Sequence, residues 1–262
     1  MSEKTTALIT GASAGIGKEM ARVFAANGHD LVLVARRQSA LQQLAAELRE
    51  AHGVHVSVRA ADLALDNAPD ALFESLADTR IDILVNNAGV LSGGAFRKMA
   101  QSDIDNMIRL NICALTGLCR LFVEPMLERG HGRIVNIASI AAFQSVPTLA
   151  VYAATKAYVL SLGESLNVEL GRRGVSVTTV CPGFTDTEML RGTTQPESGS
   201  HGLGEMLVLQ PQRVAQDAYR ACMAGTAIKV TGLHYATATA ATRLLPRWVL
   251  RNAGKVALLL KS

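Results

Sequence analysis

The sequence has little of what metal sites and disulfide scaffolds require. Its 262 residues include only four cysteines and six histidines. The cysteines have no metal-ligand spacing, and the histidines form neither an HxxxH nor an HExxH pattern. We therefore expect no metal ion. The scattered thiols favour a reducing compartment over a disulfide framework, and they lead us to expect a cytoplasmic protein. The cysteines are Cys113, Cys119, Cys181 and Cys222.

Strong charge of one sign and long apolar runs are also scarce. Hydrophobic residues make up 49%, charged residues 18% and aromatic residues 4%, with a formal net charge of +4. This profile is typical of a soluble globular chain, and the dispersed positive residues argue against nucleic acid as a partner. The first residues lack the basic and apolar stretches of a signal peptide. No apolar run approaches the ~20 residues that a membrane-spanning helix needs.

Short apolar runs alternate with longer helical patterns along most of the chain. The runs are continuous, as expected of strands covered on both faces. They lie at 7–10, 31–35, 54–58, 81–85, 133–137, 175–180 and 227–230. The helical patterns lie at 15–27, 39–51, 102–129 and 152–172. This alternation predicts one α/β domain over 1–262, Rossmann-like, with a doubly wound parallel β-sheet and helices on both faces.

Residues 186–210 interrupt this rhythm. The segment is rich in Gly, Ser and Thr, yet it carries apolar residues such as Met189, Leu190 and Leu209. A long irregular insertion in a compact domain is often a lid or a binding loop. We predict a substrate lid here, with a variable surface loop as the alternative.

The C-terminal segment, about 240–262, carries a basic stripe. Arg243, Arg247, Arg251 and Lys255 recur every four residues, so they share one face of a helix and leave apolar residues for another. Such a basic amphipathic tail suits peripheral contact with a membrane, packing against a second subunit, or a cover over the substrate cleft. The plainest alternative is the solvated face of a docked helix, and the proline at 246 argues against one unbroken helix.

A glycine-rich turn follows the first predicted strand and opens the first helix. It contains Gly11, Ser13, Gly15, Ile16 and Gly17. Glycines allow a tight turn and a close approach of backbone to phosphate, and the helix N-terminus offers free N–H groups to a pyrophosphate. The GxxxGxG spacing differs from the general GxGxxG fingerprint. Its place between strand and helix nevertheless predicts a dinucleotide site.

Two arginines, Arg36 and Arg37, come directly after the second predicted strand. In doubly wound dinucleotide folds an acid near this point binds the ribose 2′-hydroxyl, whereas arginine accommodates a 2′-phosphate. No Asp or Glu stands between residues 31 and 46. A planar guanidinium suits phosphate, so the pair favours NADP(H) over NAD(H). The alternative is a solvated pair at the end of the strand.

Tyr152 and Lys156 are spaced to share one helix face, and Ser139 precedes the tyrosine by thirteen residues. An ammonium beside a phenol stabilises the phenolate, so we expect Lys156 to lower the pKa of Tyr152. Such a tyrosine can exchange a proton with a carbonyl or alcohol oxygen, which Ser139 would hold by donating a hydrogen bond. Taken alone, this spacing fits an ordinary helix face equally well.

Motifs in a fixed order closely resemble the short-chain dehydrogenase/reductase family over residues from about 5 to 190. They are Thr10-Gly11-x-x-x-Gly15-x-Gly17, Asp62-Leu63, Asn86-Asn87-Ala88-Gly89, Asn111, Ser139, Tyr152-x-x-x-Lys156 and Pro182-Gly183-x-x-x-Thr187.

The resemblance implies a role for each of these motifs. Asp62 would contact the adenine amino group, Leu63 would border the ring, and Asn87 to Gly89 would pass the cofactor. Asn111 would help to hold a water molecule in a proton relay, although a polar residue that kinks the helix is the alternative. Lys156 would also bind the nicotinamide ribose. Three residues would shape the nicotinamide pocket, namely Pro182, Gly183 and Thr187.

The implied activity is hydride transfer between NADP(H) and a carbonyl or alcohol substrate, with tyrosine as the acid or base. The segment 141–147, Phe184 and the lid predict an apolar small-molecule substrate, with packing of the fold as the alternative for these positions. Arg191 is a candidate for one anionic group. The family also implies a homodimer or homotetramer formed through the helices at 102–129 and 152–172. The alternatives are a catalytically idle NADP-binding regulator and a membrane-surface interaction protein. The intact set of Asn111, Ser139, Tyr152 and Lys156 argues against an idle scaffold.

Overall fold

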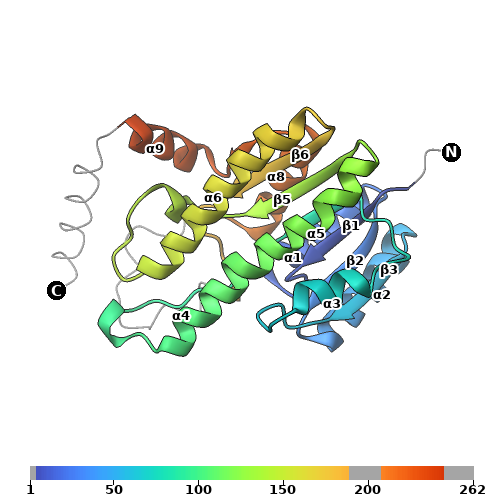
Figure 1. Cartoon of the computed structure of the whole chain (residues 1–262), viewed down its shortest axis with the longest axis horizontal. Coiled ribbons are helices and arrows are strands. Elements are labelled where there is room, and N and C mark those ends of the chain that lie inside the picture. Colours follow the sequence, from blue (N-terminus) through green and yellow to red (C-terminus); the bar gives the residue numbers. More distant parts are fainter. Residues whose placement is uncertain (1–3, 189–207, 245–262) are drawn as a thin grey trace.

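Seven parallel strands form one sheet in the order β3-β2-β1-β4-β5-β6-β7 (Figure 1). The computed structural model describes residues 4–188 and 208–244. The strands are β1 (Thr6–Thr10), β2 (Asp30–Ala35), β3 (Val56–Ala60), β4 (Ile83–Asn86), β5 (Gly132–Ile137), β6 (Val175–Cys181) and β7 (Ile228–Val230). Each predicted strand is present, with its ends shifted by a few residues.

Helices cover both faces of this sheet. They are α1 (Gly15–Ala26), α2 (Gln38–His52), α3 (Ala68–Glu74), α4 (Gln101–Ile108), α5 (Leu115–Glu128), α6 (Ala150–Gly171), α8 (Pro211–Met223) and α9 (Leu233–Leu244). Short turns of helix complete the fold at η1 (Phe96–Lys98), η2 (Arg109–Ala114) and η3 (Ile140–Phe143).

Two apolar cores result, one on each face of the sheet. One contains Phe24 and Leu44, from α1 and α2, together with residues of α8. The other contains Leu118, Phe122 and Val159, from α5 and α6. The middle strands are buried throughout, which explains their continuous apolar sequences. The doubly wound Rossmann-like prediction is confirmed.

The strand order reverses between β1 and β4. These two strands are neighbours in the sheet, while the chain visits β2 and β3 between them. The connections therefore diverge above the carboxyl ends of β1 and β4 and leave a crevice, which is where open α/β sheets bind ligands.

The stretch from α4 to α5 is one continuous helix with a wider π-helical turn, η2, in its middle. Among the described residues this run, Gln101–Glu128, is the one helix long and apolar enough to cross a membrane by length and composition. It packs against β4, β5 and α3. A core helix of this kind passes the same test, so the finding is weak evidence for a span.

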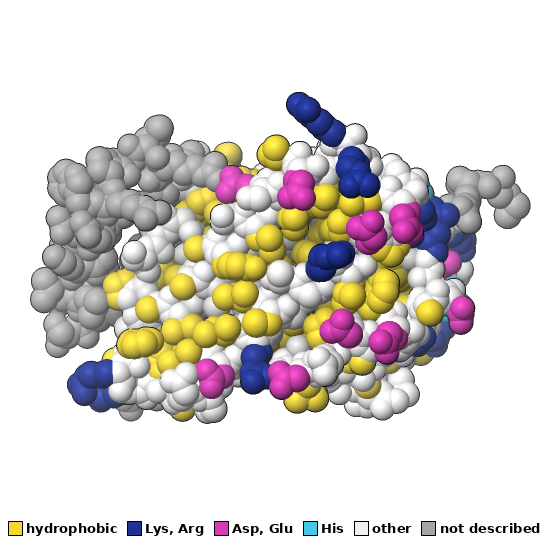
Figure 2. Space-filling view, in the orientation of Figure 1, with side chains coloured by type: hydrophobic (Ala, Val, Ile, Leu, Met, Phe, Trp, Pro, Cys, Tyr) yellow, Lys and Arg dark blue, Asp and Glu magenta, His cyan; other side chains and the backbone are white. Residues whose placement is uncertain are grey.

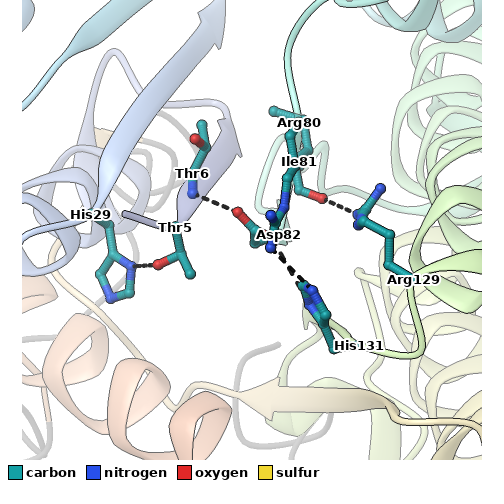
Figure 3. A network of polar contacts seen from close by, with 8 residues as sticks. All are labelled: Thr5, Thr6, His29, Arg80, Ile81, Asp82, Arg129 and His131. Carbon is teal, nitrogen blue, oxygen red and sulfur yellow. Dashed lines mark hydrogen bonds and ion pairs between the residues drawn. The ribbon is translucent and has the colours of Figure 1, made fainter. Parts of the chain in front are cut away.

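A network of polar contacts joins the amino ends of the strands, at the edge of the sheet opposite the crevice (Figure 3). The buried Asp82 carboxylate accepts hydrogen bonds from the Thr6 N–H at 2.9 Å and from Arg80 Nε at 2.8 Å. His131 Nδ1 lies 4.0 Å from Oδ1 of the same carboxylate. Beside it, His29 Nδ1 and the Thr5 hydroxyl are hydrogen-bonded at 2.6 Å. Burial lowers the pKa of His29, so this ring stays neutral.

The predicted lid and tail fall largely outside the described residues. The base of the lid is visible, because Leu209 pairs in parallel with Thr185 and its N–H donates to the Phe184 carbonyl. Helix α9 extends to Leu244, and the rest of the predicted tail is not described. The described residues also do not reach Arg191, nor the lid residues Met189, Leu190, Met206 and Leu207.

Candidate active site

A cleft of about 780 Å³ opens above the carboxyl ends of the strands. It is lined by residues that the sequence assigns to the cofactor and to catalysis, which come from loops far apart in the chain. They are Gly11, Ser13, Gly15, Ile16, Arg36, Arg37, Asp62, Leu63, Asn87, Gly89, Ser139, Tyr152, Lys156, Pro182, Gly183 and Thr187. Two predicted residues, Gly17 and Asn111, lie behind this surface. The structure thus brings nearly the whole predicted set together.

The glycine turn is held down by the end of β4. Gly11 has a left-handed φ of +67°, and a Cβ there would lie 2.7 Å from Asn87 Nδ2. That amide donates to the Thr10 carbonyl at 2.9 Å, while Thr10 Oγ1 accepts the Asn87 N–H at 3.0 Å. A side chain at Gly17 would overlap Asn87 and Gly11. Asn87 therefore braces the turn, and Gly17 allows the close packing beneath it.

The turn provides a cradle that fits a pyrophosphate. Helix α1 begins at Gly15 and its N-cap residue, Ala14, offers no side-chain cap, so the first N–H groups face the cleft. A Cβ on Gly15 would lie 3.2 Å from Thr187 Cγ2, which leaves little room for any larger residue. The exposed backbone and the positive end of the helix dipole suit an anion at this point.

The two arginines stand at the mouth of the cleft, each beside a carboxylate. Arg36 Nη1 lies 3.9 Å from Asp62 Oδ2. Arg37 Nη2 lies 3.2 Å from Glu188 Oε2, and its Nε is 3.4 Å from Ser13 Oγ. All four charged side chains are well exposed, so these pairs are weak and exchangeable. Both guanidinium groups are therefore available to an anionic ligand group beside the Ser13 turn.

Ser139, Tyr152 and Lys156 meet on the floor of the cleft. Ser139 hydrogen-bonds to the Tyr152 hydroxyl, and its Oγ accepts the Ala141 N–H at 3.1 Å. Lys156 is buried, with Nζ donating to the Ile137 carbonyl at 2.9 Å and lying 5.7 Å from the centroid of the Tyr152 ring. The i, i+4 spacing on α6 thus places both groups over the end of β5.

The pKa values differ from the simplest expectation. Burial raises the pKa of Tyr152, and the hydrogen bond from Ser139 opposes that rise. Burial also lowers the pKa of Lys156 to about 8, which the nearby Cys181 thiol opposes. The predicted lowering of the tyrosine pKa by Lys156 is therefore absent in the protein alone. The physical reason is that desolvation of the phenolate outweighs the hydrogen bond from Ser139, while the Lys156 ammonium donates to a backbone carbonyl.

Asn111 lies in the π-helical turn and is almost fully buried. Its side chain bonds both backbone groups of Val90, with Oδ1 accepting the N–H at 2.9 Å and Nδ2 donating to the carbonyl at 2.9 Å. A third bond joins Nδ2 to Thr155 Oγ1 at 3.1 Å. Asn111 thus fixes the loop after β4 against α6, which is a bracing role in addition to the predicted water relay.

Sequence reasoning missed two supporting residues, Thr155 and Tyr235, and it named Thr10 only as part of the glycine-turn motif. Thr155 is a small hydroxyl residue inside a helix, where nothing in its spacing distinguishes it from a packing position. Tyr235 comes from α9 and packs on Gly183, where a Cβ would overlap its ring. Groups of His, Cys, Asp or Glu able to hold a metal do not occur within 4–188 and 208–244.

Comparisons with known proteins agree with this geometry. Residues 5–198 match the model of the short chain dehydrogenase family. A short-chain dehydrogenase from Sphingobium yanoikuyae, solved in complex with NADPH, is 35% identical with a TM-score of 0.80, covering 98% of this chain and 96% of that one. The bulky-bulky ketone specific alcohol dehydrogenase from Comamonas testosteroni is 34% identical with a TM-score of 0.79, covering 98% and 94%.

A putative ketoacyl reductase from Streptomyces coelicolor is 39% identical over 194 residues, which are 71% of this chain and 73% of that protein. The chain belongs to the short-chain dehydrogenase/reductase family, whose members are oxidoreductases that use NAD(P)(H). The glycine cradle, the cleft volume and the paired arginines all fit such a dinucleotide.

Proposed function

We propose that this protein is an NADPH-dependent reductase of apolar, bulky ketones. The observation that carries the proposal is one cleft with Arg36 and Arg37 at one end and Ser139, Tyr152 and Lys156 at the other. The glycine turn lines the cleft between these two ends, where it suits the pyrophosphate of the cofactor. The arginines support NADP(H) over NAD(H), because arginine accommodates a 2′-phosphate. The acid that would bind the ribose 2′-hydroxyl of NAD(H) is absent from residues 31–46.

Each catalytic group has one task in this proposal. The nicotinamide supplies the hydride when it is bound. Ser139 and Tyr152 donate hydrogen bonds to the substrate oxygen, and Tyr152 gives it a proton. The phenol of Tyr152, which is hydrogen-bonded to Ser139, is the proton donor that reduction of a carbonyl requires. Lys156 stands next to Gly89 and Asn111, where it can bind the nicotinamide ribose.

The substrate end of the cleft supports an apolar ketone. Beyond Ser139 it is lined by Ile140, Val146, Leu149 and Phe184, and the one amide there is Gln144 among the described lining residues. Because the side chain of Phe184 is 55% exposed, it is free to cover an aliphatic or aromatic group. Similarity to the ketone-specific enzyme and to a ketoacyl reductase suggests the two substrates to compare first.

Turnover with NADPH and NADH tests the cofactor proposal. Wild-type protein is mixed with a panel of bulky ketones and a 3-oxoacyl thioester, and oxidation of each cofactor is followed. We expect kcat/KM for NADPH to exceed that for NADH by at least tenfold, a difference of about 1.4 kcal/mol. Arg36→Asp should shrink or reverse this ratio, because a carboxylate repels the 2′-phosphate. Equal use of both cofactors by the wild type refutes the NADPH preference.

Tyr152→Phe tests the catalytic assignment. The ring and its packing remain while the proton donor is lost, so we expect kcat to fall by about 10²–10⁴-fold. NADPH affinity, measured by the fluorescence of the bound cofactor, should stay within about threefold. Tyr158→Phe is the matched control, because Tyr158 is an exposed residue of the same helix and bonds Thr116 instead. Near-normal turnover by Tyr152→Phe contradicts the assignment.

We also propose a homo-oligomer formed through α5 and α6. Figure 2 shows apolar side chains spread over the face that carries these helices. Tyr158 and Val168 of α6 are exposed, Val168 by 79%, and Ile108 at the end of α4 is exposed as well. The four cysteines form no disulfide within the described residues, which fits the reducing, cytoplasmic setting that we propose.

A further inference from the structure

Helix α9 lies beyond the matched family region, yet one of its side chains supports the cleft. The ring of Tyr235 packs so closely against Gly183 that a Cβ on Gly183 would overlap three ring atoms. Tyr235 is 9% exposed. A glycine is needed at 183 because the ring occupies the space of a side chain. The contact therefore depends on both residues.

The hydroxyl of Tyr235 fixes the next residue, Phe184. Burial raises the pKa of Tyr235, and a hydrogen bond from the Phe184 backbone opposes that rise. A bond that stabilises a phenolate is one donated to its oxygen, so the donor is the Phe184 N–H. The Phe184 carbonyl accepts from the Leu209 N–H at 2.8 Å. Both backbone groups of Phe184 are thus held from outside the cleft.

The aromatic side chains continue this arrangement to the cleft surface. The rings of Phe184 and Tyr235 meet edge to face, with centroids 6.3 Å apart. His234 lies on Tyr235 with centroids 4.2 Å apart. Phe184 lines the cleft, whereas Tyr235 stays behind its wall. The position of the Phe184 ring toward the substrate is therefore set by a residue that does not touch the substrate.

We propose that Tyr235 is a positioning residue that sets the width of the substrate end of the cleft and so determines which ketones are accepted. It acts through Gly183, which borders the cofactor region, and through Phe184, which borders the substrate. This inference rests on the proposed ketone reductase activity for its selectivity, but its structural part stands independently. Loss of the Tyr235 ring frees the Gly183–Phe184 backbone to move outward.

Three variants separate this positioning role from general packing. Tyr235→Phe removes the bond to Phe184 and keeps the ring. Tyr235→Leu removes both. Tyr219→Leu is the matched control, because Tyr219 is a partly buried tyrosine of α8 that packs on Phe24 and His29 and does not line the cleft.

The first readout is hydrogen–deuterium exchange of the backbone, which requires no turnover. We expect the amide of Phe184 to exchange at least tenfold faster in Tyr235→Phe and in Tyr235→Leu than in wild type. The Leu variant should also loosen neighbouring amides of the segment, and Tyr219→Leu should leave all of them unchanged. If Tyr235→Leu does not fold, the exchange of Phe184 in Tyr235→Phe decides. Unchanged exchange in Tyr235→Phe overturns the proposal.

The second readout is the ratio of kcat/KM for a bulky and a small ketone. We expect Tyr235→Leu to change this ratio at least fivefold, mainly through KM, while Tyr235→Phe changes it less than twofold. Tyr219→Leu should lower the melting temperature and keep the wild-type ratio. An equal ratio in all three variants overturns the selectivity role. If wild type reduces no ketone, the proposed function fails, and the exchange data still decide whether Tyr235 holds Phe184.

Discussion

Lys156 carries its positive charge in a place where burial opposes one. Its pKa falls from 10.5 to about 8, with desolvation as the main cause. The charged side chain then costs the folded protein about 3 kcal/mol at neutral pH, at 1.36 kcal/mol for each pKa unit. A residue chosen for stability alone would be apolar here. This loss of stability is consistent with a lysine that serves to bind a ligand, because functional sites are often less stable than an apolar core would be.

We predict that Lys156→Met is more stable than wild type at pH 7 by about 1–2 kcal/mol. Methionine removes the charge, and the Ile137 carbonyl loses its donor, which offsets part of the gain. Below pH 8 the lysine is protonated in both states, so the penalty is complete. Between pH 8 and 10.5 the unfolded chain holds more protons, so wild type gains stability as the pH rises and the difference shrinks.

Urea unfolding of both proteins at pH 7 and pH 9.5 measures this difference. Lys98→Met is the control, because Lys98 is exposed in η1 and its replacement should change stability by less than about 0.5 kcal/mol. If Lys156→Met is clearly less stable than wild type at pH 7, the charged Lys156 side chain stabilises the folded protein and the prediction is wrong.

The residues at the centre of the site could be predicted from the sequence, whereas the residues that hold them in place could not. The spacing of Tyr152 and Lys156 on one helix face follows from helix geometry alone, as does their common position above Ser139 once the strands are placed. Tyr235 gave no such signal. Its partner Gly183 lies far away in sequence, and the fit between ring and glycine exists only in three dimensions.

The packing of α6 on β6 depends on one glycine. A Cβ on Gly163 would overlap Thr179 Oγ1 and lie 3.3 Å from Thr179 Cβ. Thr179 is fully buried, and its hydroxyl has no hydrogen-bond partner among the described residues. The close approach brings the N-terminal part of α6, which carries Tyr152 and Lys156, onto the end of the sheet.

We predict that Gly163→Ala lowers the free energy of unfolding by about 1–3 kcal/mol, because the new methyl group overpacks the contact. Thr179→Ala should be close to neutral alone, since it removes an unpaired buried hydroxyl, and it should restore much of the loss in the double variant. Thermal unfolding of the four proteins gives the coupling energy.

Gly171→Ala is the control for helix propensity in the same helix. A Cβ there meets nothing within 4 Å, so alanine should be neutral or stabilise by up to about 1 kcal/mol. Equal effects of the alanines at 163 and 171 would show that the contact with Thr179 is not tight.

Elements with one dominant pattern were the ones that the sequence predicted. Continuous apolar runs located all seven strands, although β4 begins at Ile83 rather than Ile81. The π-helical turn η2 was not predicted, and Asn111 within it bonds to Val90 in another loop, a contact that the sequence does not show. Helices α3 and α8 were not predicted, and for α3 the reason is that a seven-residue helix has too few turns for a clear period.

At the scale of the whole molecule, the two edges of the sheet have different tasks. The carboxyl edge carries the cleft, with exposed arginines and a costly buried lysine. The amino edge carries the Asp82 network, which joins β1, β4 and the turn before β5 (Figure 3). Polar groups there are paired with one another. Changes at this edge should therefore alter stability and spare ligand binding.

Asp82→Ala tests this division. Asp82 is 4% exposed, and its carboxylate accepts bonds from Thr6 and Arg80, so its loss removes the acceptor of a partly buried N–H and one contact of a guanidinium. We expect a loss of about 2–4 kcal/mol in the free energy of unfolding. The Kd for NADPH, measured by fluorescence well below the melting temperature, should stay within about twofold.

Asp66→Ala is the control, because its pair with Arg109 is exposed and its loss should cost less than about 1 kcal/mol. A large change in NADPH affinity without loss of stability would mean that the amino edge communicates with the cleft.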